Sequence, residues 1–245
     1  MGTWPVVQAR AWARERLANA GIDSVDADVR ELLEWACDVT SQLDLPAALD
    51  PEQADKLRGG VGERALRIPL QHVTGRMYFR SLTLRSVPGV FVVRPETEVL
   101  AGLAIDEAAA AVAARGEARL VDLCTGSGAI ALAVATESAR TEVWAVEKEP
   151  DPFVLACLNR DRVGACGVHL VRGDATHPAT LGFLDGLIDR RSLTLLRPGG
   201  TLLMEHSPSQ DEALRTYAAS LGMVEVSTST DLAGRMRFLR ACAPR

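Results

Sequence analysis

The feature that most constrains the fold of this chain is a short apolar run that ends in two glycines and continues as an alanine-rich segment. The run extends from Leu120 to Leu123, Gly126 and Gly128 follow it, and an alanine-rich helical pattern continues to Ala135. An apolar run of this length before glycines predicts a buried parallel strand, a tight loop and the start of a helix. Glycine tolerates the dihedral angles of such a loop and lets a ligand approach the backbone. The chain is therefore expected to contain an α/β unit built around this loop.

A second strand pattern follows at residues 141–146, and Glu147 stands at its end. An acidic residue about 20 positions after a glycine loop, at the tip of the next strand, can accept hydrogen bonds from the hydroxyls of a ribose. The spacing therefore predicts a ligand that contains adenosine. A strand-to-helix turn that binds nothing is the alternative interpretation, and Asp122 before the loop together with Glu147 after it favours the ligand.

The details of the glycine loop, Cys124 to Gly128, separate the classes of adenosine ligand. A dinucleotide site has a third glycine where this chain has Ala131, and a P-loop has a lysine that this loop lacks. The loop instead resembles the first motif of the class I S-adenosylmethionine-dependent methyltransferases, whose ligand carries no phosphate.

Length, charge and cysteine usage narrow the class of protein. The 245 residues suffice for one or two domains, and the net charge of -5 argues against broad electrostatic capture of nucleic acid. Five dispersed cysteines and four scattered histidines indicate a reducing compartment and predict no metal site. With no signal pattern and no long apolar run, the chain is expected to be cytoplasmic and not to bind a membrane. No direct nucleic-acid binding is expected of so acidic a chain, and a monomer is expected.

Three regions are expected along the chain. Residues 1–67 have helical periodicity without a strand signal, with Gly21 ending one helix, Ser24 as a helix cap and Asp50 capping another. Residues 68–94 form a hairpin linker, in which residues 78–85 alternate as a strand. Residues 95–245 form a Rossmann-like domain.

Several motifs, in order and spacing, resemble the bacterial HemK/PrmC family of protein-glutamine methyltransferases, which modify the Gly-Gly-Gln motif of peptide chain release factors. The resemblance covers most of residues 15–241, and the Arg94-Pro-Glu-Thr-Glu98 run is its most specific part. The matching segments are Pro69–Gly75, Phe79, Pro88–Glu98, Asp122–Ala131, Leu196–Glu205, Gln210 and Asp231–Arg235.

The resemblance implies a Rossmann-like class I methyltransferase domain preceded by a helical domain that docks the release factor. It also implies that S-adenosylmethionine is held by the glycine loop along its methionine part, by Glu147 at the ribose, and by Asp174 and Ala175 at the adenine. The cofactor-binding residues implied are Cys124, Thr125, Gly126, Ser127, Gly128, Glu147, Asp174 and Ala175. Those expected to lie over the site and to order the catalytic loop are Phe91, Arg94, Glu96 and Thr97.

One departure from the family pattern concerns the acceptor. The family orients its glutamine with an Asn-Pro-Pro-Tyr motif after the fourth strand, and this chain has no such motif. Its only asparagines, Asn19 and Asn159, do not precede proline. Asn159 is expected to be a solvated helix residue, so no catalytic residue is assigned.

The missing motif coincides with a shortfall of length. About two dozen residues separate Asp174 from Pro198, too few for a strand, its loop and a helix, and residues 187–196 have the pattern of the next helix. An apparent deletion is therefore placed near residues 186–187. A degenerate natural paralogue, a deletion and a segment left out of the sequence are the alternatives, and the gap that a lost strand leaves in a sheet favours the last two.

Three functions are weighed. The first is methylation of a release-factor glutamine amide by direct transfer from the sulfonium. The second is a non-catalytic remnant that binds the cofactor or the release factor without turnover, which the missing motif favours. The third is methylation of a nucleic-acid amine, which the acidic charge and the helical N-terminal region disfavour.

Overall fold

The structure is a computed structural model, and it describes residues 3–175 and 196–245. The chain forms two compact units. The helical unit comprises residues up to Met77 with Ser86–Pro88, and the sheet unit comprises Tyr78–Arg85 with Gly89–Arg245. The apparent deletion near residues 186–187, and all but the last residue of the helix expected at 187–196, lie outside the described residues.

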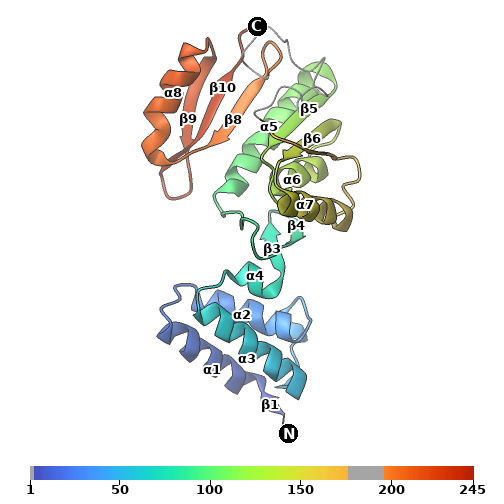
Figure 1. The fold of residues 1–245 in the computed structure, drawn as a ribbon, viewed down its shortest axis with the longest axis vertical. Helices are drawn as coiled ribbons and strands as arrows, with labels where there is room; N and C mark the ends of the chain where they lie inside the picture. Colours follow the sequence, from blue (N-terminus) through green and yellow to red (C-terminus); the bar gives the residue numbers. More distant parts are fainter. Residues whose placement is uncertain (1–2, 176–195) are drawn as a thin grey trace. The chain divides into compact units, whose positions relative to one another are not determined.

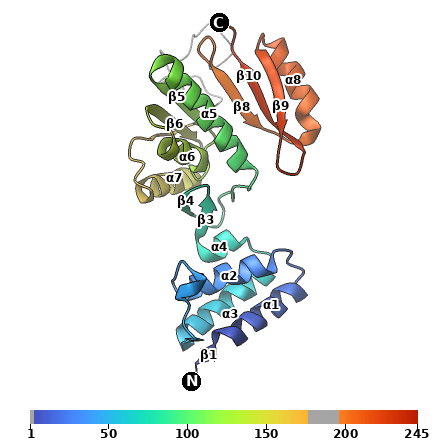
Figure 2. The ribbon, with the colours of Figure 1, turned by 180° about the vertical axis from the view of Figure 1, so that it is seen from behind.

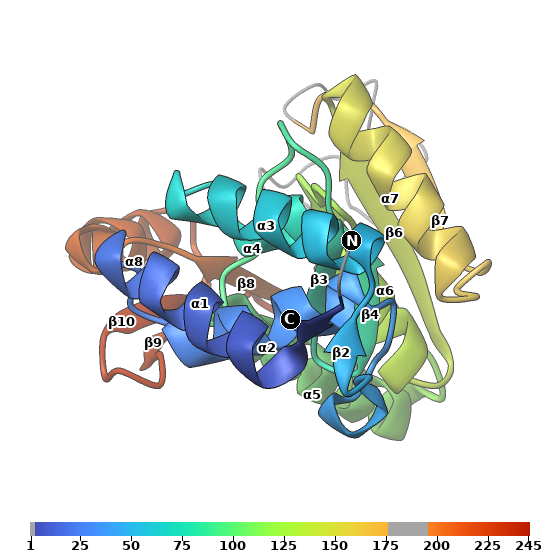
Figure 3. The same cartoon turned by 90° about the horizontal axis from the view of Figure 1, so that it is seen from below.

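The helical unit is built from four α-helices and a short 3-10 helix (Figures 1 and 3). Their apolar faces form one core that includes Leu17, Leu32, Leu33 and Leu57. The elements are α1 (Val6–Asn19), α2 (Val25–Ala36), η1 (Gln42–Asp44), α3 (Pro51–Ala65) and α4 (Leu70–Thr74). The expectation of no strand here was wrong in one detail, because β1 (Trp4–Pro5) pairs with β2 (Ala48–Leu49).

Local signals in the sequence explain where these helices start and stop. Asp50 and Gln53 form a capping box with reciprocal side-chain to backbone bonds, as the Asp50-Pro51 pair predicts. Ser24 is the N-cap of α2, but its hydroxyl donates to Asp28 Oδ1 at 2.7 Å instead of accepting from the helix backbone. Gly60 lets α3 approach α2 closely, since a Cβ there would lie 2.7 Å from the Trp35 ring.

The region expected to be one strand, residues 78–85, is a hairpin instead. Strand β3 (Arg76–Phe79) pairs with β4 (Leu82–Arg85), and Arg80 in the turn has a φ of 52°. Arg80 is held in this conformation by Glu98, whose carboxylate accepts its backbone N–H at 3.1 Å, and by an ion pair with Glu137 at 2.6 Å. Alternation of residue type continues through the turn, which is why the pattern alone showed no break.

The first sheet of the sheet unit is parallel, with strand order β5–β6–β7. Helices α5, α6 and α7 pack against it. The elements in chain order are α5 (Thr97–Arg115), β5 (Ala118–Leu123), α6 (Ala129–Glu137), β6 (Thr141–Glu147), α7 (Pro150–Arg162) and β7 (His169–Arg172). The alternation of strands and helices confirms the predicted α/β Rossmann-like fold.

The second sheet is antiparallel, with strand order β8–β10–β9. Figure 2 shows α8 beside its strands, with which it makes its contacts. The elements are β8 (Thr201–Glu205), η3 (Pro208–Gln210), α8 (Asp211–Ser220), β9 (Val224–Thr230) and β10 (Met236–Cys242). Within the described residues, β5 and β8 each pair with a strand on one side only, and α5 contacts both.

No helix in the described ranges has both the length and the apolar character needed to cross a membrane.

Candidate functional site

The glycine loop joins β5 to α6 and has left-handed backbone at three of its five positions. The φ angles are 61° at Cys124, 58° at Gly126 and 86° at Gly128. A side chain at Gly128 would crowd Leu132 in its own helix at 3.2 Å, whereas a Cβ at Gly126 would meet nothing within 4 Å. Gly128 is therefore favoured by its positive φ and by the tight contact with Leu132, and Gly126 leaves open space beside the backbone.

Glu147 ends β6 and turns its carboxylate back onto the loop. Its Oε2 accepts the N–H of Gly126 at 2.9 Å, and its Oε1 accepts the N–H of Glu149 at 2.9 Å. The side chain is only 7% exposed. A carboxylate has about four lone-pair positions, so two acceptor positions remain beyond these two bonds.

Asp122, near the end of β5, holds the glycine loop and the first turn of α6 by hydrogen bonds. One of its oxygens accepts the Thr125 hydroxyl at 2.6 Å and the Ala131 N–H at 3.3 Å. Burial, with a smaller contribution from the Glu147 carboxylate, raises the pKa of Asp122 to about 6 against the opposing effect of its two hydrogen bonds. Asp122 therefore acts as a loop anchor on which two donors converge.

The end of β7 brings a third carboxylate to the same edge of the sheet. Asp174 forms an ion pair with Lys148 at 3.1 Å, and Ala175 follows it. Burial raises the pKa of the Cys124 thiol, and the carboxylates of Glu147, Asp122 and Asp174 add to the rise. The structure thus gathers the expected cofactor residues of all three strand ends at one place, as parallel strands require.

The four residues expected to lie over the site have contacts elsewhere in the sheet unit. The guanidinium of Arg94 lies 6.0 Å from the centre of the exposed Phe91 ring. Glu96 accepts a hydrogen bond from Arg235 at 2.7 Å, and the Thr97 hydroxyl donates to Glu205 at 2.8 Å. These bonds attach the start of α5 to the antiparallel sheet, and the role of the four residues toward a cofactor stays a prediction.

The expectation for Asn159 was wrong. Its side chain in α7 is fully buried, with 0% exposure, and bonds to both backbone groups of Arg85 and to the carbonyl of Ser127 in the glycine loop. One signal was available in the sequence, since Asn159 stands three and four residues after the apolar Ala156 and Leu155. That spacing places it on the buried face of the helix.

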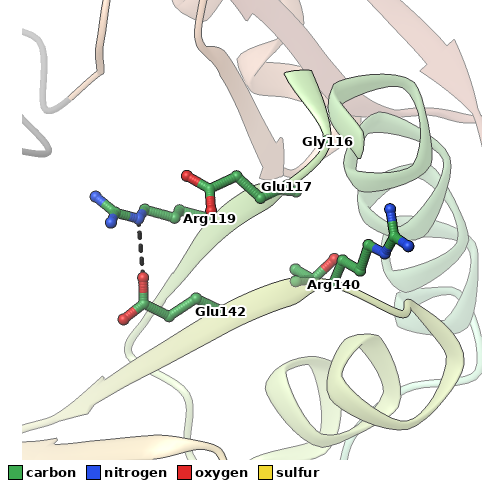
Figure 4. Close-up of a pocket in the computed structure, with 7 residues that line it drawn as sticks. Gly116, Glu117, Arg119, Arg140 and Glu142 are labelled. Atoms are coloured by element: carbon green, nitrogen blue, oxygen red, sulfur yellow. Dashed lines mark ion pairs between the residues drawn. The ribbon is translucent and has the colours of Figure 1, made fainter. Parts of the chain in front are cut away.

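The strand ends opposite the glycine loop also carry a hollow. It has a volume of about 410 Å³ and is lined by residues 116–119 and 140–142, at the starts of β5 and β6 (Figure 4). Arg119 and Glu142, which both line it, form an ion pair at 2.8 Å, and the hollow is open to solvent. Because ligands of open parallel sheets bind at the carboxyl ends of the strands, this hollow is not assigned to the cofactor.

The residues at the carboxyl edge fit an adenosine-containing cofactor without a phosphate. Gly126 leaves room against the backbone, and Glu147 keeps two acceptor positions at the place where a ribose diol is expected. No lysine follows the loop to contact phosphates. Fold and site together define an α/β protein whose strand-to-helix loop has room and acceptor groups that suit a nucleoside-type ligand.

Comparison with known proteins identifies the family. A family model described as the PrmC N-terminal domain matches residues 8–75. A release factor glutamine methyltransferase of Streptomyces coelicolor is 35% identical, over 94% of this chain and 95% of that protein. The enzyme of Bifidobacterium longum is 32% identical over 94% of this chain and 96% of its own length. The enzyme of Mycobacterium tuberculosis is 32% identical over 96% of this chain and 90% of its own length. The chain belongs to the release factor glutamine methyltransferase family.

The same comparison shows that the alignment is longer than the chain. Its alignment with the Bifidobacterium longum protein spans 287 positions, whereas the chain has 245 residues. At least 42 positions of that relative therefore have no counterpart here. Among solved structures, a methyltransferase from Pyrococcus furiosus aligns over 68% of this chain and 91% of its own, with 17% identity and a TM-score of 0.46.

Proposed function

We propose that this chain transfers a methyl group from S-adenosylmethionine to the side-chain amide of the Gly-Gly-Gln glutamine of a peptide chain release factor, far more slowly than its relatives do. The observation that carries the proposal is that the chain belongs to the family and has Glu147 bonded to the glycine loop. S-adenosylmethionine supplies an activated methyl group on a sulfonium. The residues of the chain bind and orient that donor.

The donor side of the reaction rests on the carboxyl edge of the parallel sheet. Glu147 would accept the ribose hydroxyls through its two remaining acceptor positions, and the backbone of Cys124 to Gly128 would lie along the methionine part. Asp174 and Ala175 would border the adenine. The cofactor site would be covered by four further residues, Phe91, Arg94, Glu96 and Thr97. The side chain of Glu147 suits this role because a carboxylate offers several acceptor positions to neighbouring hydroxyls.

The acceptor side is where this chain differs from the family pattern. Transfer to an amide requires the nitrogen to be aimed at the methyl group and positive charge to be drawn off as it forms. The family uses Asn-Pro-Pro-Tyr for this, and the chain lacks that sequence. A slow reaction, with the donor well held and the acceptor poorly oriented, follows from this difference.

The helical unit is proposed to dock the release factor. It has its own core, it matches the PrmC N-terminal model over residues 8–75, and the donor-binding residues all lie in the sheet unit. The protein is proposed to act as a monomer in the cytoplasm, where release factors work.

The test is transfer of labelled methyl from S-adenosylmethionine to a purified release factor, with the Streptomyces coelicolor relative as reference. Slow labelling of the glutamine is expected, and a release factor with that glutamine changed to alanine should stay unlabelled. Donor and release-factor binding with no labelling would support the second candidate, a binding remnant, which the shortfall of at least 42 positions favours.

A further inference from the structure

The side chain of Asn159 connects two segments of the sheet unit that are far apart in sequence. Its Oδ1 accepts the N–H of Arg85 at 2.7 Å, and its Nδ2 donates to the carbonyl of Arg85 at 3.3 Å. Bonding to both backbone groups of one residue resembles the pairing of a strand with its neighbour. The same Nδ2 also donates to the carbonyl of Ser127 at 3.0 Å, in the middle of the glycine loop.

Burial makes this connection strong. Asn159 is fully buried, Ser127 is 2% exposed, and the bond between them is buried. A buried amide that loses its partners retains the cost of leaving water, so the three bonds tend to be kept or lost together. Ser127 stands between two glycines with positive φ, which are costly to fix in one conformation. A fixed carbonyl at Ser127 removes part of that cost before a ligand arrives.

A second bond between α7 and the hairpin has no connection with the loop. The Nε of Arg162 donates to the carbonyl of Thr83 at 3.1 Å, on the exposed side of the same helix. This bond tethers α7 to β4 as Asn159 does. It therefore offers a matched control for attachment alone.

We propose that Asn159 is a positioning residue that couples the glycine loop to strand β4, so that a cofactor seated on the loop also orders the hairpin. The proposal rests on the proposed function, since it takes S-adenosylmethionine or its product as the ligand. By linkage, a ligand that steadies Ser127 must strengthen the bonds to Arg85, and loss of those bonds must weaken the ligand.

The experiment compares the wild-type protein with Asn159→Asp and Arg162→Met. S-adenosylhomocysteine binding is measured by calorimetry, and exchange of the Arg85 amide hydrogen by nuclear magnetic resonance. Asn159→Asp removes the donor to Ser127 and should raise the dissociation constant about tenfold, the effect of one buried hydrogen bond. Arg162→Met should leave it within about twofold. In the wild type, ligand should slow exchange at Arg85, and in Asn159→Asp it should not.

Each outcome decides the proposal. The proposal is overturned if Asn159→Asp and the wild type bind S-adenosylhomocysteine with equal affinity. It is also overturned if the ligand does not change the exchange rate of the Arg85 amide in the wild type. If Asn159→Asp does not fold, the ligand dependence of Arg85 exchange in the wild type decides alone. If the wild type binds no S-adenosylhomocysteine, the cofactor assignment fails. The coupling is then judged without ligand: Asn159→Asp should speed exchange at the amides of Gly126 and Gly128, and Arg162→Met should not.

Discussion

The two sheets of the sheet unit differ in what their residues do. In the parallel sheet β5–β6–β7, Glu147 bonds to the glycine loop at one strand end, and Asp174 pairs with Lys148 at the next, on the edge proposed for the cofactor. In the antiparallel sheet β8–β10–β9, the buried carboxylate of Asp231 is bonded by the side chains of Arg235 and Arg237. The polar groups at the ends of the parallel strands are proposed to bind a ligand. Those of the antiparallel sheet bond to one another and stabilise the turn between β9 and β10.

The comparison also locates what the chain lacks. Helix α5 contacts β5 of the parallel sheet and β8 of the antiparallel sheet. Its side-chain bonds, from Thr97 to Glu205 and from Glu107 to Arg240 and Thr201, all go to the antiparallel sheet. The described edges of β5 and β8 each have no strand partner on one side. The family's acceptor motif follows a fourth strand, and the sequence analysis predicts that the chain is short near residues 186–187, outside the described residues. The chain thus has the residues proposed for the donor and lacks the Asn-Pro-Pro-Tyr sequence proposed for the acceptor.

The largest effect is expected from restoring a strand and an Asn-Pro-Pro-Tyr loop after Gly186, a position outside the described residues. One oriented acceptor at a charge-developing site is worth about 2.7–4 kcal/mol, by analogy with oxyanion-hole donors. Methyl transfer to a release factor should therefore rise by orders of magnitude, as measured with labelled cofactor. A matched insert with Asn changed to Ala controls for sheet repair alone. Equal turnover with and without the insert would place the acceptor site elsewhere.

The second-largest effect is expected from removing the helical unit, which is proposed to dock the release factor. Neither sheet is given that role. Deleting residues 1–67 should abolish release-factor binding in a pull-down, since the core of that unit is lost. Binding of S-adenosylhomocysteine should stay largely intact, as its residues lie in the sheet unit. If the truncated protein holds the release factor as well as the full chain does, the helical unit is only a structural cap.

Glu147→Ala tests the ligand edge of the parallel sheet. Loss of hydrogen bonds to a charged group should weaken S-adenosylhomocysteine binding by about 1–3 kcal/mol in calorimetry. Glu142→Ala is the matched control, since Glu142 lies on the same strand at the opposite end and pairs with Arg119. An unchanged affinity in Glu147→Ala would remove that residue from the site.

The smallest effects are opposite pH dependences in the two sheets. Burial raises the pKa of Asp122 to about 6, so its ionisation costs stability as pH rises from about 4 to 6. Burial opposes the ionisation of Asp231, but its hydrogen bonds, chiefly from Arg235 and Arg237, lower its pKa to about 2. The stability that the ionised Asp231 contributes to the fold is therefore lost as pH falls from about 4 to 2. Compared with wild type in melts across pH, Asp122→Asn should gain relative stability between pH 4 and 6. Asp231→Asn should be less stable than wild type near neutral pH, and this difference in stability should disappear as pH falls below 4. Differences that do not vary with pH would contradict both shifts.

The local elements of the fold were predictable from the sequence. The strand before the glycine loop, the acidic residue that ends the next strand and the capping box at Asp50 each depend on residues a few positions apart. The site followed for the same reason, because parallel strands bring their carboxyl ends to one edge. Glu147 was predicted from its place at the tip of a strand and Asp174 from the family resemblance. The structure places both at ends of parallel strands, and their role toward a cofactor stays a prediction.

The sequence by itself determined the family, the α/β class and the cofactor edge, since these depend on local patterns and on motifs in fixed order. Only the tertiary structure decided that Asn159 is buried between Ser127 and Arg85, and that residues 78–85 turn back on themselves at Arg80. Both depend on partners between 18 and 74 residues away in the chain. A polar residue with distant partners looks like any solvated one in sequence. Its burial is favourable only where folding brings those partners within hydrogen-bond distance.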